Sequence, residues 1–420
     1  MQAEPAGDVL VLNSGPSTIT YHLIDPGTGS RRAAGAVGPI GGSEPGQLRH
    51  YLFPRSADQP EHHPNSAPDL AQTRDLPDHE SAMAAILATF QRTGPDLEGD
   101  APLAVGHRVA HGGTRFTDPV LVDDAVAAHI EDLFPLSPQH NPANHAGIQL
   151  ARTAFPTLPH VAAFDTGFHH TLPSHAHTYA VPTAWRDQFG VRRYGSHGIS
   201  YRYVSQRAAA LLGRDETDVN LIVLHLGDES SACAISGGES VETSTGLTPL
   251  EGLMTSTGSG AVDPSLAMYL KRVAGLDTAA VDSVLNHDSG LLGLSGKTDL
   301  RDVWTAADRG DPAARLAIDV YCHSIRKYIG AYYAVLGRVD AIVFTGVIGE
   351  RASRTRAQAL TGLGRLGIGV HRERNNAPGV SERFVSPTGA EVPVLVVPTD
   401  EAAEISAQVL GCLRPALACH

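Results

Sequence analysis

Small amide and hydroxyl side chains follow the first apolar run of the chain, in the stretch GDVLVLNSGPSTITYHLID at residues 7–25. The run from Val9 to Leu12 predicts a short buried strand, and the extended pattern that resumes at Ile19 predicts its hairpin partner. The tip between them carries Asn13 and Gly15, and glycine lets the backbone approach a ligand closely. Such a tip can hold a phosphate group, but the same residues also form an ordinary hairpin turn. Both interpretations stay open on this stretch alone.

Several other strand-type runs also end on polar residues. They lie at residues 101–110, 160–166, 219–228, 339–349 and 392–401, and end with the sequences HRVAHGG, FDT, HLGD, TGVIGE and PTDE. Helix-like segments such as HESAMAAILATFQR and YRYVSQRAAALLG lie between them, and this alternation predicts α/β architecture. Ligands of open α/β sheets bind at the carboxyl ends of the strands. The polar strand ends therefore predict a ligand-binding cleft.

Composition limits the kind of partner. The 420 residues, 42% of them hydrophobic, are enough for two domains with cores of their own. A net charge of −13 argues against binding to nucleic acid or to an anionic membrane, so a small molecule is the expected partner. An anionic ligand would have to be met by local arginines.

Location and redox state follow from two further features. No apolar run reaches the roughly 18 residues that a membrane span needs, and MQAEPAGD lacks the features of a secretory signal, so we expect a cytoplasmic protein. The four cysteines show no paired metal-ligand spacing and predict reduced thiols: Cys233, Cys322, Cys412 and Cys419.

The assembled motifs resemble those of the acetate kinase (acetokinase) family, in the superfamily of acetate and sugar kinases and actin. The resemblance runs from about residue 9 to residue 401 and rests on VLVLNSG, GHRVAHGG, HNPANHAGI, FDTGFHHTLP, RRYGSHGIS, HLGDESSACAI, TGLTPLEGLM, SGAVDP, LLGLSGKTDLRD, DAIVFTGVIGE and VVPTDE. It implies an α/β fold of two actin-like (ribonuclease H-like) domains with an interdomain active-site cleft, and a homodimer. Residues 1–165 and about 400–420 would form an acyl and phosphate-side domain closed by the C-terminal helix, and residues 166–399 a nucleotide-binding-type domain.

The resemblance also implies roles for individual residues. Phosphoryl transfer to a carboxylate needs positive charge, hydrogen-bond donors, Mg²⁺ on the nucleotide and an aligned acceptor oxygen. The implied catalytic residues are Arg108, Asp165, His197 and His225, of which the arginine would hold the carboxylate or phosphoryl group and the histidines would donate to the phosphoryl group in flight. Asn13 and Glu401 would lie at the metal, and Asn13, Gly227, Asp228, Asp299, Arg301 and Gly349 would bind Mg-ATP or Mg-ADP.

The sequence departs from the family pattern mainly where nucleotide and phosphate would bind. Pro16 removes a backbone N–H from the first loop, and Thr20 stands where a lysine is expected. Asp228 and Glu229 replace an asparagine and a glycine, so two negative charges would oppose a triphosphate by about 1 kcal/mol each. Val347 replaces a glycine of the adenosine loop. These changes leave ATP use in question.

The acyl pocket implied by the resemblance has also changed. Acetate kinases commonly line it with valine, leucine, phenylalanine and proline; the aligned residues here are Ala110, Gln139, Ser196 and Pro249, while Gly258 replaces a second active-site arginine. A roomier wall with an amide and a hydroxyl favours an acid larger and more polar than acetate, because unpaired buried polar groups penalise an apolar ligand.

Three hypotheses remain. The first is a phosphotransferase that interconverts a polar carboxylic acid and its acyl phosphate with Mg-ATP and Mg-ADP. The second is a reassigned enzyme without nucleotide use, catalysing acyl phosphate hydrolysis or acyl transfer, in which the acids at 228 and 229 serve as base or metal ligands. The third is a non-catalytic homologue, since a fold by itself does not establish an activity.

Overall fold

The computed structural model describes residues 7–53, 67–379 and 381–417. The chain divides into two compact units, Met1–Gly167 together with Asp400–His420 (unit 1), and Phe168–Thr399 (unit 2). No helix of the described residues is long and apolar enough to cross a membrane.

Unit 1 is built on one mixed sheet. Among its described residues the strand order is β5-β4-β3-β2-β1-β6-β8-β7, with β1 to β5 antiparallel and β1, β6 and β8 parallel. The strands are β1 Val9–Ser14, β2 Ile19–Ile24, β3 Arg31–Gly38, β4 Gly46–Leu52, β5 Leu70–Arg74, β6 Ala104–Val109, β7 Val120–Leu121 and β8 His160–Phe164. The predicted hairpin of the first stretch is thereby confirmed as β1 and β2.

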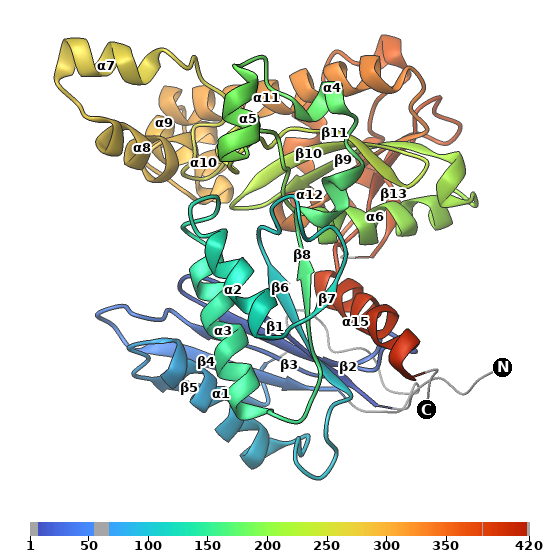
Figure 1. Cartoon of the computed structure of the whole chain (residues 1–420). Helices are drawn as coiled ribbons and strands as arrows, with labels where there is room; N and C mark the ends of the chain where they lie inside the picture. The colour runs from blue at the N-terminus through green and yellow to red at the C-terminus, as the bar shows by residue number, and fades with distance from the viewer. Residues whose placement is uncertain (1–6, 54–66, 380, 418–420) are drawn as a thin grey trace. The chain divides into compact units, whose positions relative to one another are not determined.

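Helices cover both faces of this sheet (Figure 1). They are α1 His79–Thr93, α2 Asp124–Asp132, α3 Asn141–Ala154 and α15 Glu401–Leu417. Val105 of β6 belongs to the core under α1, whereas the next residue, Gly106, faces Ile405 and Val409 of α15. Alternate residues of a strand point to opposite faces, so α15 and α1 lie on opposite sides of the sheet. A Cβ at Gly106 would come within 2.8 Å of Val409, so the glycine allows α15 to pack closely.

Unit 2 repeats the same plan. The strand order among its described residues is β11-β10-β9-β12-β14-β13, an antiparallel meander joined to the parallel pairs β9–β12 and β12–β14. The strands are β9 Asn220–Leu226, β10 Ser230–Ser236, β11 Glu239–Thr243, β12 Ala341–Thr345, β13 Arg383–Phe384 and β14 Val394–Val396. The helices are α4 Ser174–His177, α5 Thr183–Phe189, α6 Gly198–Leu211, α7 Leu266–Ala274, α8 Thr278–His287, α9 Gly290–Ser295, α10 Leu300–Asp308, α11 Pro312–Leu336, α12 Gly346–Arg351, α13 Ser353–Ala359 and α14 Arg372–Asn376.

Two hydrophobic cores flank the sheet of unit 2. Ile222 and Leu224 of β9 pack with α10 and α11, while Leu221 and Val223 of the same strand pack with α6. The strand is therefore apolar on both faces, as expected for a central strand covered by helices. Both units confirm the predicted α/β class.

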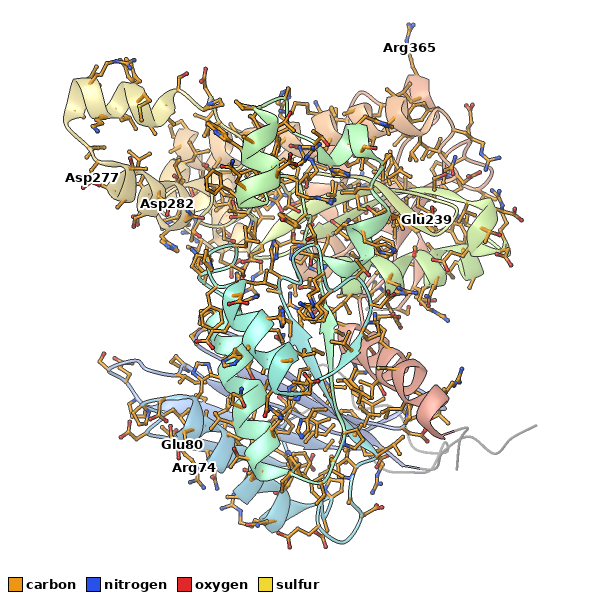
Figure 2. All side chains as sticks on the ribbon, viewed as in Figure 1. Arg74, Glu80, Glu239, Asp277, Asp282 and Arg365 are labelled. Carbon is orange, nitrogen blue, oxygen red and sulfur yellow. The ribbon has the colours of Figure 1, made fainter. Side chains whose placement is uncertain are left out.

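Charged side chains lie on the outside of both units. Arg74 and Glu80 of unit 1, and Glu239 and Asp282 of unit 2, are exposed and point into solvent (Figure 2). None of these four residues is among the site residues predicted from the sequence.

Candidate active site

Four of the residues predicted to act gather at one sheet edge of unit 1. Parallel pairing of β1, β6 and β8 brings their carboxyl ends together, and Asn13, Arg108 and Asp165 lie on or directly after these ends. Arg108 donates from Nη2 to Asp165 Oδ2 at 2.5 Å and from Nη1 to Asn13 Oδ1 at 3.4 Å. Glu401, the first residue of α15, places Oε2 3.7 Å from Arg108 Nε. The structure therefore gathers the other three side chains around the guanidinium group of Arg108.

This cluster has the composition of a cation site. It holds one guanidinium and two carboxylates, and Oδ1 of the buried Asp165 accepts no hydrogen bond from the described residues. Mg²⁺ is held in proteins by one or two carboxylates together with water and phosphate oxygens, so Asp165, Glu401 and Asn13 fit the magnesium that the resemblance implies. The described residues contain no group of three His, Cys, Asp or Glu that could hold a metal by itself. Phosphate oxygens and water would have to complete the coordination.

Two asparagines that the sequence analysis left without a role hold the loops around this cluster. Asn141 accepts from the His111 backbone N–H at 3.1 Å and donates to the carbonyl of the same residue at 3.0 Å. Asn144 accepts from Ala110 N–H at 3.0 Å and donates to the carbonyl of Ser14 at 2.8 Å. Both are buried at the start of α3. The signal in the sequence was HNPAN, where two amides flank a proline that begins a helix.

The predicted histidines meet in unit 2. The rings of His197 and His225 stack, with centroids 4.2 Å apart and planes inclined by 10°. His225 lies on β9, and His197 occupies the N-cap position of α6 with a left-handed backbone, φ 56°. Gly195 leads into this turn at φ 86°, where a Cβ would come within 2.3 Å of the His169 ring. A glycine is required there because both the conformation and the space exclude a side chain.

The β9–β10 turn carries the two unexpected acids beside this pair. Gly227 N–H donates to the Glu229 carbonyl at 2.9 Å and closes the turn, and both acidic side chains are exposed. Oε2 of Glu229 lies 3.8 Å from Nε2 of His197. The Asp228 carbonyl accepts from Ser256 N–H at 3.2 Å, so its backbone is tied to the following loop. A carboxylate therefore lies near the ring nitrogen that is predicted to donate a hydrogen bond to the phosphoryl group.

The predicted acyl-pocket residues are divided between the units. Ala110 and the exposed Gln139 belong to unit 1, and Ser196, Pro249 and Gly258 belong to unit 2. The Ser196 hydroxyl donates to Thr245 Oγ1 at 3.1 Å. Gly258 is buried, and its N–H donates to Thr255 Oγ1 at 2.7 Å.

The remaining predicted nucleotide contacts, Asp299, Arg301 and Gly349, are local features of unit 2. Asp299 caps α10 and forms an ion pair with Arg301, Nη2 to Oδ2 at 2.5 Å, and the hydrogen bonds from Arg301 lower the pKa of this carboxyl. Gly349 is buried in α12, while the side chain of Val347 on the same helix is 64% exposed. In unit 1, Thr20 lies directly opposite Asn13 in the β1–β2 hairpin, and Pro16 is exposed at its tip.

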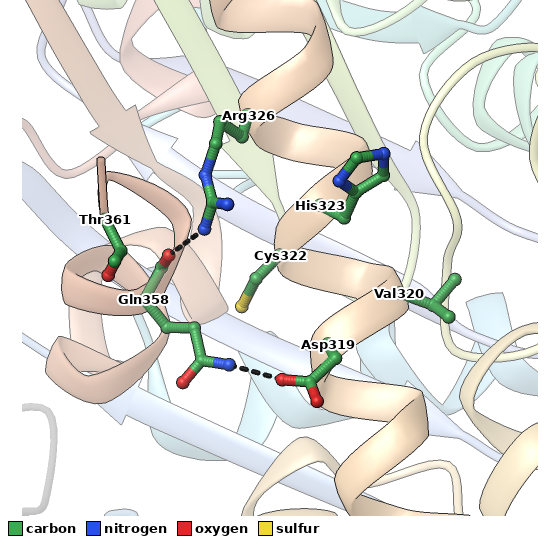
Figure 3. A pocket seen from close by; sticks show the side chains of 7 residues that line it. All are labelled: Asp319, Val320, Cys322, His323, Arg326, Gln358 and Thr361. Atoms are coloured by element: carbon green, nitrogen blue, oxygen red, sulfur yellow. Dashed lines mark hydrogen bonds between the residues drawn. The ribbon is translucent and has the colours of Figure 1, made fainter. Parts of the chain in front are cut away.

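A separate pocket of about 650 Å³ lies on unit 2 at α11 and α13 (Figure 3). Three of its polar side chains are tied to each other or to the backbone: Gln358 Nε2 donates to Asp319 Oδ1 at 2.6 Å, and Arg326 Nη2 donates to the Gln358 carbonyl at 2.6 Å. Burial raises the pKa of Cys322 to about 12, so this thiol is not a nucleophile at neutral pH. None of the site residues predicted from the sequence lines this pocket.

The chain is similar to known proteins along nearly its whole length. The acetokinase family model matches residues 8–407. The acetate kinase of Streptomyces avermitilis is 47% identical over 408 residues, which cover 97% of this chain and 98% of the relative. The crystal structure of Porphyromonas gingivalis acetate kinase superposes with a TM-score of 0.88 at 37% identity, covering 97% of this chain and 100% of the other. A propionate kinase from Francisella tularensis gives 0.86 at 33% identity, with coverages of 96% and 99%. These likenesses confirm the predicted fold class, α/β with two actin-like domains.

Proposed function

The chain belongs to the acetokinase family and is a phosphotransferase of the acetate and propionate kinase type; on that premise we propose that it interconverts a carboxylic acid larger and more polar than acetate and its acyl phosphate, using Mg-ATP and Mg-ADP. The observation that carries the proposal is the arrangement of Asn13, Asp165 and Glu401 around Arg108. A planar guanidinium suits bidentate binding of a carboxylate or phosphoryl group. Around it stand the oxygen ligands that a magnesium nucleotide needs.

The chemistry needs few residues. A carboxylate oxygen of the acid attacks the γ-phosphorus of ATP, the bond from that phosphorus to the β-phosphate oxygen breaks, and ADP leaves with the electron pair. Arg108 would orient the attacking carboxylate, and His197 and His225 would donate hydrogen bonds to the phosphoryl oxygens as charge redistributes. When bound, Mg²⁺ supplies charge neutralisation on the phosphates, and Asp165, Glu401 and Asn13 would hold it.

The size and polarity of the acid rest on the pocket residues. Ala110 leaves room that a valine would fill, and Ser196 keeps the acceptor capacity of its hydroxyl while donating to Thr245. Gln139 adds an exposed carboxamide. A hydroxyl or carboxyl group on the acid would donate a hydrogen bond to the Ser196 hydroxyl, whereas a methyl group would not.

A second candidate, nucleotide-independent chemistry on an acyl phosphate, is favoured by two observations. The Glu229 carboxylate faces Nε2 of His197 at 3.8 Å, where it opposes a triphosphate and could act as a base toward water. The exposed Val347 also stands where the resemblance expects space for adenine.

Calorimetric titration with Mg-ATP and with Mg-ADP separates the two candidates. Binding in the micromolar to millimolar range supports the kinase, and a hydroxylamine trap then identifies the acid among polar carboxylates. Absence of binding overturns nucleotide use and leaves the second candidate.

Arg108→Ala is expected to lower the rate about 1000-fold, by analogy with other transition-state arginines. Arg152→Ala, which removes an ion pair with Asp124 in the same unit, is the control and should keep the rate. A wild-type rate in both variants would overturn the role proposed for Arg108. We also propose a homodimer, which sedimentation equilibrium tests.

A further inference from the structure

The two stacked histidines are braced by two serines in a crosswise arrangement. Nδ1 of His197 lies 2.7 Å from Ser231 Oγ, and Nδ1 of His225 lies 2.8 Å from Ser200 Oγ. Ser231 stands on β10 directly opposite His225 of β9, yet its hydroxyl contacts the other histidine. Ser200 stands on α6, the helix that His197 caps, yet its hydroxyl contacts His225. The ring of His225 is therefore held by α6, the helix that His197 caps, and the ring of His197 is held by β10, the strand paired with the one that carries His225.

A second hydroxyl backs each serine. Tyr201 Oη lies 2.5 Å from Ser231 Oγ, and Thr399 Oγ1 lies 2.7 Å from Ser200 Oγ. Ser200, Ser231 and Tyr201 are fully buried. Thr399 is half-buried, and its backbone N–H donates to Glu350 Oε1 at 3.2 Å. Burial keeps the pKa of Tyr201 well above its ordinary value, so this phenol retains its proton.

A hydroxyl group has one proton to donate, so the direction of one hydrogen bond of each serine sets the direction of the other. Where Tyr201 donates to Ser231, the serine proton is directed to Nδ1 of His197. Where Thr399 donates to Ser200, the serine proton is directed to Nδ1 of His225. A neutral imidazole that accepts at Nδ1 carries its own proton on Nε2.

We infer that the pairs Tyr201–Ser231 and Thr399–Ser200 are positioning devices that hold His197 and His225 as Nε2–H tautomers. Their Nε2–H groups then serve as the phosphoryl donors. The inference rests on the proposed function, because that function gives the two histidines their donor role. It assigns roles to four residues that contact neither the acid nor the nucleotide in the proposal, and it explains why a serine precedes Tyr201 on the first turn of α6. The stacked geometry follows from the same bracing, since each serine fixes one ring edge.

The tautomers can be measured independently of activity. In ¹⁵N-histidine-labelled full-length protein at about pH 9, above the ordinary titration of imidazole, the two-bond ¹H–¹⁵N spectrum distinguishes Nδ1–H from Nε2–H. The chain has 21 histidines, so His197→Asn and His225→Asn serve to assign the two rings. We expect both rings of the wild-type protein to carry the proton on Nε2. An Nδ1–H tautomer on either ring overturns the inference for that ring.

The variants Ser231→Ala and Ser200→Ala test whether the serines impose this state. Each should bring the Nδ1–H tautomer into the spectrum of its ring, and kcat should fall about 10-fold or more with KM nearly unchanged. Tyr201→Phe and Thr399→Val should act in the same direction, and Thr399→Ser should restore the wild-type spectrum and rate.

Two matched controls report the cost of losing a buried hydroxyl. Ser205→Ala removes a buried serine on α6 whose partners are Arg202 and Glu216, and Tyr321→Phe removes a buried phenol 3.3 Å from Ser230. Both should leave the tautomers and kcat unchanged at a similar loss of thermal stability. Alanine variants whose spectra and kcat match these controls overturn the inference. Wild-type protein that phosphorylates no acid but shows the expected spectrum overturns the proposed function and still supports the bracing.

Discussion

Removing the carboxylate of Glu229 is the most direct test of the charge argument at the histidine pair. The side chain is 47% exposed, and its Oε2 lies 3.8 Å from His197 Nε2. A phosphoryl oxygen that accepts from Nε2 must approach within about 3 Å of that nitrogen. The phosphoryl group and the Glu229 carboxylate would then compete for one position, and Glu229→Gln removes the charge while keeping the shape.

The size of the effect follows from Coulomb's law. Two unit charges about 5 Å apart repel by about 0.8 kcal/mol in bulk water, and by about four times as much at an effective dielectric constant of 20. Because nearly half of the Glu229 side chain is exposed, the value near the aqueous limit applies. We therefore expect Glu229→Gln to strengthen phosphate binding by about 1 kcal/mol, or about fivefold in Kd.

The assay is calorimetric titration with inorganic phosphate, together with the KM for acetyl phosphate, at low and at high salt. The fivefold gain should shrink as ionic strength rises, because the interacting charges face solvent. Glu239→Gln is the matched control: this glutamate is exposed at the β10–β11 turn of the same sheet and should change neither constant. An unchanged Kd in Glu229→Gln, or an equal gain in Glu239→Gln, would refute the claim that the charge of Glu229 itself opposes phosphate binding. The net negative charge of the protein would then be the remaining electrostatic explanation.

Three further predictions concern the nucleotide, the second arginine and acid stability. Val347→Gly should strengthen Mg-ATP binding severalfold in calorimetry and leave phosphate binding unchanged, because it opens the adenosine loop and lies outside the core; equal changes for both ligands would contradict this. Adding Gly258→Arg to Asp228→Asn and Glu229→Gly should raise acetate kinase activity about 1000-fold or more, since a missing transition-state arginine typically costs this much; a flat rate would contradict both the charge argument and the missing-arginine argument. Burial lowers the pKa of His107 to about 3, so the folded protein keeps this ring neutral while the unfolded chain takes up a proton below about pH 6.5. The free energy of unfolding should therefore fall as the pH drops from 6.5 toward 3, and His107 should account for about 2 kcal/mol of this loss at pH 5. Urea unfolding should show that His107→Gln loses about 2 kcal/mol less than the wild-type protein between pH 7 and pH 5. Equal losses in both proteins would refute the interpretation that His107 is buried and neutral.

The fold class can be predicted from the sequence because strand-type runs that end on polar residues alternate with helix-like segments. Parallel strands bring their carboxyl ends to one edge, so polar residues at the ends of β1, β6 and β8 were expected to meet, and Asn13, Arg108 and Asp165 do. The family assignment is confirmed because the motifs cover nearly the whole chain. The catalytic and pocket roles given to these residues stay predictions.

The supporting residues could not be predicted because their contacts depend on register and backbone conformation. Ser231 reaches the histidine pair only because β10 pairs with β9 in a register that sets it opposite His225. His197 presents its ring through a left-handed N-cap, a conformation that nothing in its residue type indicates. Asn144 joins Ala110 and Ser14, which are 96 residues apart in the chain, and no local pattern reports such a contact.

The distribution of buried polar groups bears on whether the chain is an enzyme. A buried carboxylate oxygen without a hydrogen bond, such as Oδ1 of Asp165, costs about 1–3 kcal/mol unless a ligand or water satisfies it. A protein that only kept the fold could replace Asp165 and Arg108 together by apolar residues at little cost in stability, because the two form a partly buried ion pair. The departures at Asp228, Glu229 and Val347 lie at exposed positions, where a change costs little stability, whereas Gly258 is buried. The cluster around Arg108 is kept although it costs stability, while exposed loops on the nucleotide side have changed. This pattern is expected of an enzyme with changed specificity, and it favours an enzyme over a non-catalytic homologue.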